Sequence, residues 1–175
     1  PEEIRDTIDL DVQHTFQAAS RNNIIWGLNY RLSNDDTTGN FVISLDPASR
    51  TQHLLSAFAQ DEIRLIGDEL FLTIGTRIEK NSFSTSSLEW EPNIRLSWNT
   101  SDTQTLWGSV ARAVRVPSRI EQAATINGAL IPAGEQGNAL PLPLAVTIMS
   151  DPELDTEEVI AYELGYRQQF SESTH

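Results

Sequence analysis

The sequence predicts an all-β protein, an antiparallel meander of about seven long strands with short turns at one end and long loops at the other. Three observations support this fold class. Apolar and polar residues alternate with period two over runs of about ten residues. Residues that favour turns separate these runs. The connections alternate in length along the chain, short and then long.

The composition limits the classes of function. The chain has 175 residues, enough for one domain with a core, and a formal net charge of -13. Such an acidic surface repels phosphates, so no nucleic-acid partner is expected. The sequence has no cysteine, which excludes a disulfide framework and cysteine zinc sites. No apolar run reaches the roughly 18 residues of a transmembrane helix. A transmembrane β-barrel needs no such run, because its strands are short and alternate.

The first two predicted strands cover about residues 6–18 and 23–32, and a short polar turn at 19–22 joins them. Both strands carry an apolar face and a polar face, with one residue of each kind in turn. The apolar faces hold Ile8, Leu10, Val12, His14 and Phe16 in the first strand and Ile24, Trp26, Leu28, Tyr30 and Leu32 in the second. The next segment, about 33–50, is rich in Asp, Asn and Gly and is expected to be a loop.

The clearest hairpin is predicted over residues 51–66 and 69–80, closed at Gly67 and Asp68. Unbroken alternation in its first strand places Phe58 on the polar face and Asp61 on the apolar face. A β-bulge would correct both placements, because one extra residue reverses the alternation. After a loop at about 81–91, a third hairpin pairs residues 92–99 with 103–114.

The segment from 115 to 156 is expected to be one long loop. It holds five prolines and has neither a helical nor a strand period. The part at 140–149 is distinctly apolar and could cap a ligand or cover a sheet edge. The last predicted strand, about 157–170, alternates well. In a meander, all the short connections then fall at one end and all the long ones at the other, as in an outer-membrane barrel.

Several segments resemble the barrel of TonB-dependent outer-membrane receptors, in the same order along the chain. They are Asp9-Leu10-Asp11-Val12-Gln13-His14, Trp26-Gly27-Leu28-Asn29-Tyr30-Arg31, Phe58-Ala59-Gln60-Asp61-Glu62, Thr73-Ile74-Gly75-Thr76-Arg77, Pro92-Asn93-Ile94-Arg95-Leu96-Ser97-Trp98, residues 107–119 and Tyr162-Glu163-Leu164-Gly165-Tyr166-Arg167. The resemblance implies a barrel of about 22 strands with a plug domain in its lumen. It also implies the outer membrane of a Gram-negative bacterium, contact with its lipid, and uptake of a scarce ligand such as a ferric siderophore with energy from TonB.

The sequence departs from that family pattern in its extent. Neither a plug domain nor a TonB-box segment is visible, and about seven strands cannot enclose a plugged lumen. We therefore expect residues 1–175 to be a partial barrel domain and a fragment of a longer receptor, in which TonB acts through the absent plug. Two open sheet edges would promote self-association of the isolated chain, unless its own loop covers an edge.

Three arginines at the root of the long loop, Arg112, Arg115 and Arg119, are the predicted ligand-binding residues. An arginine fork suits carboxylate and phosphate-like groups. The alternative is that they pair with the acidic residues at the far root of the loop, namely Asp151, Glu153, Asp155, Glu157 and Glu158. A second set is expected on the polar face, either facing the barrel lumen or forming cross-strand pairs on a solvated face. This set is Arg31, Arg77, Glu163 and Arg167.

No catalytic or cofactor motif is present, so we expect no enzyme activity, no cofactor and no metal site. The three histidines, His14, His53 and His175, lie far apart in the sequence. Six aromatic residues lie near strand ends or along the apolar faces, where they would form the girdles of a membrane barrel or, alternatively, part of an ordinary sandwich core; they are Trp26, Tyr30, Trp98, Trp107, Tyr162 and Tyr166. An alternative function is a soluble or secreted β-sheet binding module, for example for carbohydrate. In that case the apolar face would pack against a second sheet about 10 Å away. An enzyme with an unrecognised site is a third possibility.

Overall fold

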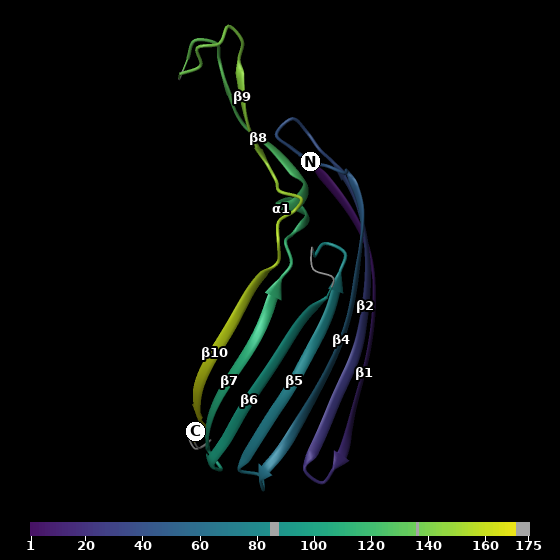
Figure 1. Ribbon diagram of the computed structural model, residues 1–175, viewed down its shortest axis with the longest axis vertical. Helices are drawn as coiled ribbons and strands as arrows, with labels where there is room; N and C mark the ends of the chain where they lie inside the picture. The colour runs from purple at the N-terminus through teal and green to yellow at the C-terminus, as the bar shows by residue number, and fades with distance from the viewer. Residues whose placement is uncertain (85–87, 136, 171–175) are drawn as a thin grey trace, which may run out of the picture.

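The computed structural model describes residues 1–84, 88–135 and 137–170, and most of them belong to one antiparallel sheet (Figure 1). Its strand order is β1-β2-β4-β5-β6-β7-β10. The strands are β1 (Glu2–Ala19), β2 (Asn22–Thr38), β4 (Ser49–Ile66), β5 (Leu70–Asn81), β6 (Glu89–Ser101), β7 (Gln104–Arg115) and β10 (Glu157–Gln168). This arrangement confirms the predicted all-β meander of seven long strands. Among the described residues the sheet does not close, and β1 and β10 are its two edges.

The connections separate by length, as predicted. The short ones, at residues 20–21, 67–69 and 102–103, lie at one end of the sheet, which we call the turn end. The long ones lie at the opposite end, the loop end (Figure 1). Gly67 adopts a φ of 45°, a conformation that suits glycine in the tight connection between β4 and β5.

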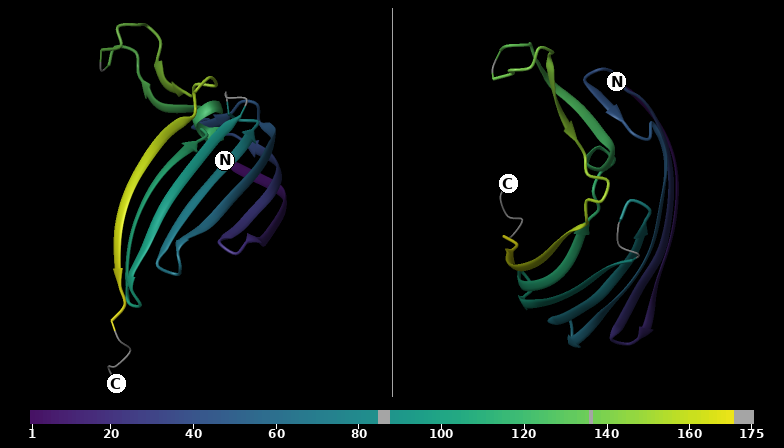
Figure 2. Two further views of the ribbon diagram at one scale, coloured as in Figure 1. Left: turned by 60° about the horizontal axis from the view of Figure 1, so that its bottom comes forward. Right: turned by 45° about the horizontal axis from the view of Figure 1, so that its top comes forward.

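The sheet is curved like a trough, and its two faces differ in chemistry (Figure 2). Residues of the polar face are the more buried ones, with Gly27 buried and Ser56 and Glu79 exposed by only 6% and 9%. On the apolar face, Val12 is 58% and Leu164 86% exposed. Side chains converge on the inside of a curve and diverge on its outside, so the polar face is the concave one. The large apolar side chains therefore point outward.

Two strands are longer than the sequence predicted. β1 begins at Glu2, and β2 runs through Asn34, Asp35 and Asp36 to Thr38. These polar residues were expected in the loop of residues 33–50. They are in a strand because β2 pairs with β1 on one side and with β4 on the other over this stretch, and this pairing satisfies the backbone groups.

The expectation of a structureless loop from 115 to 156 is wrong. This segment contains a short helix α1 (Arg119–Ala123) and the strands β8 (Ala124–Ile131) and β9 (Leu144–Met149). β8 pairs with β9 and also with β3 (Ile43–Leu45) of the β2–β4 connection, and so forms a second, three-stranded sheet. β8 and β9 are strands because they pair with each other and because β8 pairs with β3 of another connection. No alternation of apolar and polar residues within the segment indicates these strands. The β8–β9 hairpin stands beyond the loop end of the large sheet (Figure 1).

The bulge proposed for β4 is absent near Phe58. The ladder runs without interruption from Leu54 to Arg64, so Phe58 stays on the polar face opposite Gly27. A Cβ atom on Gly27 would lie 2.5 Å from Cε1 of Phe58. The glycine thus leaves the space in which the phenyl ring lies across the strand, and the alternation needs no correction. Asp61 accordingly stays on the apolar face, where its Oδ2 accepts a hydrogen bond from Asn22 Nδ2 at 2.6 Å.

β6 and β7 pair only over the part of their length near the turn end. The ladder runs from Ser101 and Gln104 to Asn93 and Ala111 and then stops. β6 stays paired with β5 as far as Glu89, and β7 stays paired with β10 as far as Arg115. The sheet therefore divides into two arms toward the loop end (Figure 1). We call this division the fork.

Candidate functional site

The register places all four predicted lumen-facing residues on the polar, concave face. Arg31 lies opposite Asp9 and donates to its carboxylate from Nε at 2.8 Å and from Nη2 at 2.5 Å. Arg77 donates from Nη2 to Glu79 Oε2 at 2.6 Å and to Ser56 Oγ at 3.2 Å. Each arginine therefore has a carboxylate partner on the same face.

Glu163 and Arg167 occupy the same face of β10. Glu163 accepts a hydrogen bond from Ser109 Oγ at 3.2 Å. Arg167 lines a hollow of about 280 Å³ together with Arg95 and Trp107, and the Arg95 guanidinium lies 5.2 Å from the centre of the indole ring. The concave face thus presents fixed charges and aromatic surface along the length of the trough.

The structure separates the three arginines that were predicted as one ligand-binding group. Arg112 and Arg115 are three residues apart in β7, and an odd spacing in a strand places side chains on opposite faces. Arg112 lies on the outward face with Val110. It donates to the backbone carbonyl of Trp90 on β6 and to the carboxylate of Glu158 on β10. Its guanidinium therefore bridges the two arms of the fork.

Arg115 lies on the concave face between two carboxylates. It contacts Glu157 Oε1 at 2.7 Å and Glu121 Oε1 at 3.0 Å. Glu121 belongs to the capping box of α1, where it accepts from the backbone N–H of Ser118 at 2.7 Å. Hydrogen bonds from Arg115 and Ser118 lower the pKa of Glu121 from 4.5 to about 2. Arg115 thereby joins the start of α1 to the start of β10.

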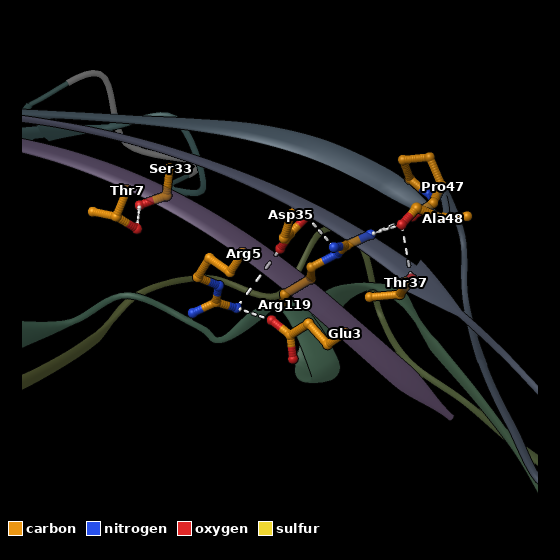
Figure 3. A network of polar contacts seen from close by, with 9 residues as sticks. All are labelled: Glu3, Arg5, Thr7, Ser33, Asp35, Thr37, Pro47, Ala48 and Arg119. Atoms are coloured by element: carbon orange, nitrogen blue, oxygen red, sulfur yellow. Dashed lines mark hydrogen bonds and ion pairs between the residues drawn. The ribbon is translucent and has the colours of Figure 1, made fainter.

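Arg119 is buried and reaches across the trough to β2 (Figure 3). Its guanidinium pairs with Asp35 and donates to the carbonyl oxygens of Pro47 at 2.6 Å and Ala48 at 2.8 Å. Arg5 of β1 approaches the same Asp35 carboxylate at 3.7 Å. The side chains of Arg119 and Asp35 are only 6% and 8% exposed.

The alternative for the arginines, pairing with the acidic end of the loop, is confirmed for two of them. Glu158 pairs with Arg112, and Glu157 pairs with Arg115. Arg119 instead pairs with Asp35, which was expected in the loop of residues 33–50. Asp35 and Glu121 were both missed. The Ser-x-x-Glu spacing of residues 118–121 was a signal for Glu121, whereas Asp35 had no local signal.

A family model described as TonB dependent receptor-like, beta-barrel, matches residues 3–174. The chain belongs to the TonB-dependent receptor family. Solved structures with the same fold include the siderophore receptor PirA from Acinetobacter baumannii, with a TM-score of 0.70, 18% identity, and coverage of 96% of this chain and 25% of that one. PirA from Pseudomonas aeruginosa has the same fold, with a TM-score of 0.72, 18% identity, and coverage of 97% of this chain and 30% of that one.

A third structure with this fold is a variant of the ferric enterobactin receptor PfeA from Pseudomonas aeruginosa, with a TM-score of 0.72, 17% identity, and coverage of 96% of this chain and 25% of that one. No curated protein sequence matched the chain. The TonB-dependent receptor chain thus spans between a quarter and a third of the length of the solved structures that it matches. The family is one of transport receptors rather than enzymes.

The outward face agrees with a receptor barrel and not with a two-sheet module. Across the described residues, no second sheet covers this face, since the small sheet joins the large one through the loop-end connections. Large side chains such as Leu28 and Ile94 remain 50% and 45% exposed. The structure therefore gives no support to the alternative of a soluble sandwich. Within the same described ranges, no helix of this receptor chain is long and apolar enough to cross a membrane.

The aromatic residues of this receptor chain divide between the faces. Trp26, Tyr30, Trp98, Tyr162 and Tyr166 lie on the outward face, exposed by 36% or more. Trp107 was expected with them, but it lies on the concave face opposite Gly165. A Cβ atom on Gly165 would lie 2.2 Å from the indole ring, so the glycine makes room for it.

The histidines of this receptor chain have aromatic neighbours. The ring of His14 stacks on Phe16 at 5.5 Å, and His53 Nδ1 lies 3.0 Å from the Tyr30 hydroxyl. His175 lies outside the described residues. Over the ranges that the structure describes, no group of three or more His, Asp or Glu residues could hold a metal ion.

Proposed function

We propose that this chain is part of the barrel wall of an outer-membrane receptor in a Gram-negative bacterium, which takes up a scarce ligand such as a ferric siderophore. The observation that carries the proposal is the two-sided, curved sheet of a chain that belongs to the TonB-dependent receptor family. Its outward face is apolar and uncovered among the described residues, which suits contact with outer-membrane lipid. Its concave face is polar and charged, which suits an aqueous or plugged lumen.

The ligand class rests on the solved relatives. The matching structures are siderophore receptors and a ferric enterobactin receptor, one of them a mutant in complex with enterobactin. In our proposal, residues 1–175 form a partial barrel domain, and energy comes from TonB through a plug domain that is not in this sequence. Arg31, Arg77, Glu163 and Arg167 would face that plug across the lumen.

Of the three loop-root arginines, Arg115 is the best placed to meet an anionic ligand. It lies on the concave face and its side chain is 51% exposed, whereas those of Arg112 and Arg119 are 23% and 6% exposed. An anionic ligand entering from the loop end would compete with Glu121 and Glu157 for this guanidinium. Arg112 and Arg119 would contribute to the site through the positions of the segments that they join.

The first test is the location of the natural polypeptide. An antibody raised against residues 1–175 should detect, in fractionated cells, an outer-membrane protein several times longer than this chain. A band in the soluble fraction would contradict the proposed location.

The second test is uptake of radioactive iron bound to enterobactin by cells that lack the natural gene and carry a plasmid copy. Uptake should depend on both the receptor and TonB. Arg115→Gln should raise the half-saturating ligand concentration about tenfold, because a charge-assisted contact is lost. Arg64→Gln is the matched control, since Arg64 is 50% exposed on the same face near the turn end. Equal effects of the two substitutions would reject the role of Arg115.

A further inference from the structure

Two arginines on the concave face, toward the turn end, form no ion pair within the described ranges. They are Arg95 of β6 and Arg167 of β10. By contrast, Arg31, Arg77 and Arg115 on the same face each pair with a carboxylate. The guanidinium groups of Arg95 and Arg167 therefore present positive charge to the lumen that the described part of the wall does not neutralise.

Both arginines line one hollow of about 280 Å³, and the register explains how they come together. Trp107 of β7 lies opposite Ser97 of β6 and Gly165 of β10. Arg95 lies two residues from Ser97 toward the loop end, and Arg167 lies two residues from Gly165 toward the turn end. The Arg95 guanidinium lies 5.2 Å from the centre of the indole ring. A group that enters the hollow can therefore contact both arginines and the ring between them.

The free polar groups of this hollow are hydrogen-bond donors. Within the part of the chain that the structure describes, the Ser97 hydroxyl and both guanidinium groups have no hydrogen-bond partner. The Thr105 hydroxyl instead donates to Asn99 Oδ1 at 2.9 Å, and Asn99 Nδ2 donates to the backbone oxygen of Asp68 at 3.0 Å. A guanidinium group has several N–H donors and no acceptor. The hollow therefore suits an anion, above all a carboxylate.

Neighbouring acidic side chains do not fill this role. Glu163 lies level with Arg95, two strands away, and accepts a hydrogen bond from Ser109 Oγ at 3.2 Å. The side chain of Asp68 is 91% exposed, and its Oδ1 lies 3.8 Å from Arg64. Neither carboxylate lines the hollow. The counter-charge for the two arginines therefore has to come from outside the described wall.

The size and the place of the hollow identify the source of that anion. Pockets that enclose a whole small-molecule ligand measure about 300–1,000 Å³, so this smaller hollow suits a single acidic group better than an iron chelate. It also lies away from the loop end, at which the transported ligand would enter. In a plugged lumen both guanidinium groups lose water, and a charge removed from water is costly unless it is paired. The plug is thus the partner that needs to supply a carboxylate here.

We propose that the hollow between Arg95 and Arg167 binds an aspartate or glutamate side chain of the plug domain of the parent receptor. The carboxylate lies between the two guanidinium groups and accepts from the Ser97 hydroxyl, with the Trp107 ring beside it. The inference rests on the proposed function, because it needs the concave face to enclose a plug. In this contact the wall supplies the cations and the plug supplies the anion, and it anchors the plug to β6 and β10.

The test is zero-length cross-linking of the full-length natural receptor in outer-membrane vesicles. A carbodiimide activates a carboxylate, and a lysine amine in contact with it then forms an amide while the urea leaves. Arg95→Lys and Arg167→Lys each place an amine in the hollow. Mass spectrometry of tryptic peptides should show at least one of these positions joined to an aspartate or glutamate outside residues 1–175.

Two further variants are the controls. Arg31→Lys is the positive control, because its amine should join to Asp9 within this chain. Arg64→Lys is the matched negative control, since Arg64 lies on the same face near the turn end but outside the hollow. The yield of links to the plug should be about tenfold lower for Arg64→Lys than for the hollow variants, because only groups held in contact react at a high effective concentration.

Three outcomes would overturn the proposal. In the first, Arg31→Lys joins to Asp9 but neither hollow variant joins to a residue outside 1–175. In the second, the hollow variants join only to carboxylates of residues 1–175, such as Glu163. In the third, Arg64→Lys joins to the plug as efficiently as they do. Iron uptake by cells with the same variants is a separate measurement: uptake without the link rejects only the plug contact, and the link without uptake rejects only the transport function.

Discussion

Arg119 and Asp35 are 84 positions apart in the sequence and form a buried ion pair that fastens the β7–β10 connection to the far side of the trough. Two backbone carbonyl groups, of Pro47 and Ala48, accept further hydrogen bonds from the same guanidinium. Arg119 thus has three hydrogen-bond acceptors, the Asp35 carboxylate and two adjacent carbonyl groups.

Removal of Asp35 should therefore destabilise the loop end strongly. Asp35→Asn leaves a buried guanidinium without its counter-charge, which costs about 3–5 kcal/mol. The free energy of unfolding can be measured by urea titration of the receptor refolded in bilayers. Glu3→Gln is the control, since Glu3 pairs with Arg5 at 2.5 Å where both side chains are about half exposed, and it should cost less than about 1 kcal/mol. A similar decrease in the free energy of unfolding for both variants would show that burial does not strengthen the contribution of the Asp35–Arg119 pair to stability.

The contact between Arg115 and Glu121 should make the stability of the α1 region depend on pH in the acid range. The pKa of Glu121 is about 2 in the folded protein and 4.5 as its ordinary value. Because the folded value is the lower one, its contribution to stability is fully present above pH 4.5 and is lost as the pH falls toward 2. Hydrogen exchange of residues 119–123, followed from pH 5 to pH 2, should show this loss. In Glu121→Gln, the amides of residues 119–123 should be less protected from exchange at pH 5 than in the wild type. Their protection should not fall further between pH 5 and pH 2 through titration of residue 121, because glutamine does not titrate.

The indole ring of Trp107 should make glycine necessary at position 165. Gly165→Ala places a Cβ atom 2.2 Å from the indole of Trp107, and such overpacking costs about 1–3 kcal/mol. The double variant with Trp107→Ala should recover part of the loss that Gly165→Ala adds. Gly108→Ala is the milder control, because its Cβ would lie 3.3 Å from the flexible end of Leu164 and at an ordinary contact distance of 3.6 Å from the backbone oxygen of Glu163. Urea titration in bilayers compares the three, and an equal cost at Gly165 and Gly108 would contradict the explanation.

Neighbouring residues of β1 should differ sharply in their tolerance of charge. Val12 faces outward and Gln13 lies on the concave face opposite Gly27. In a lipid bilayer, Val12→Arg should reduce the free energy of unfolding by about 2–4 kcal/mol. Gln13→Arg should have little effect, since its side chain points into the polar trough. Tolerance of both substitutions would mean that the outward face is not in contact with lipid.

The sequence predicted the strands well where one face is apolar and the other polar. That pattern gave the seven strands, the two faces and the separation of short from long connections, because burial and lipid contact act directly on alternate residues. It failed where pairing alone makes the strand. Asp35 and Asp36 are in β2 only because two neighbouring strands pair there, and β8 is a strand because it pairs with β9 and with β3.

The candidate site was predicted less well than the fold. Proximity in the sequence suggested that Arg112, Arg115 and Arg119 act together, although the odd spacing of the first two already indicated opposite faces of one strand. The position of Arg119 could not be predicted, since its partner Asp35 comes from a distant strand. For Phe58, unbroken alternation gave the correct face, and the β-bulge suggested to move it was wrong. The alternation could not show that Gly27 on the neighbouring strand leaves space for the phenyl ring on the polar face.

The register of β4, which is unbroken from Leu54 to Arg64, has a genetic consequence. Deletion of a single codon within this strand would exchange the lipid side and the water side of every residue up to the next connection. Natural length variants of this gene should therefore fall almost wholly in codons for the loop-end connections, where an added residue changes only the reach of a loop.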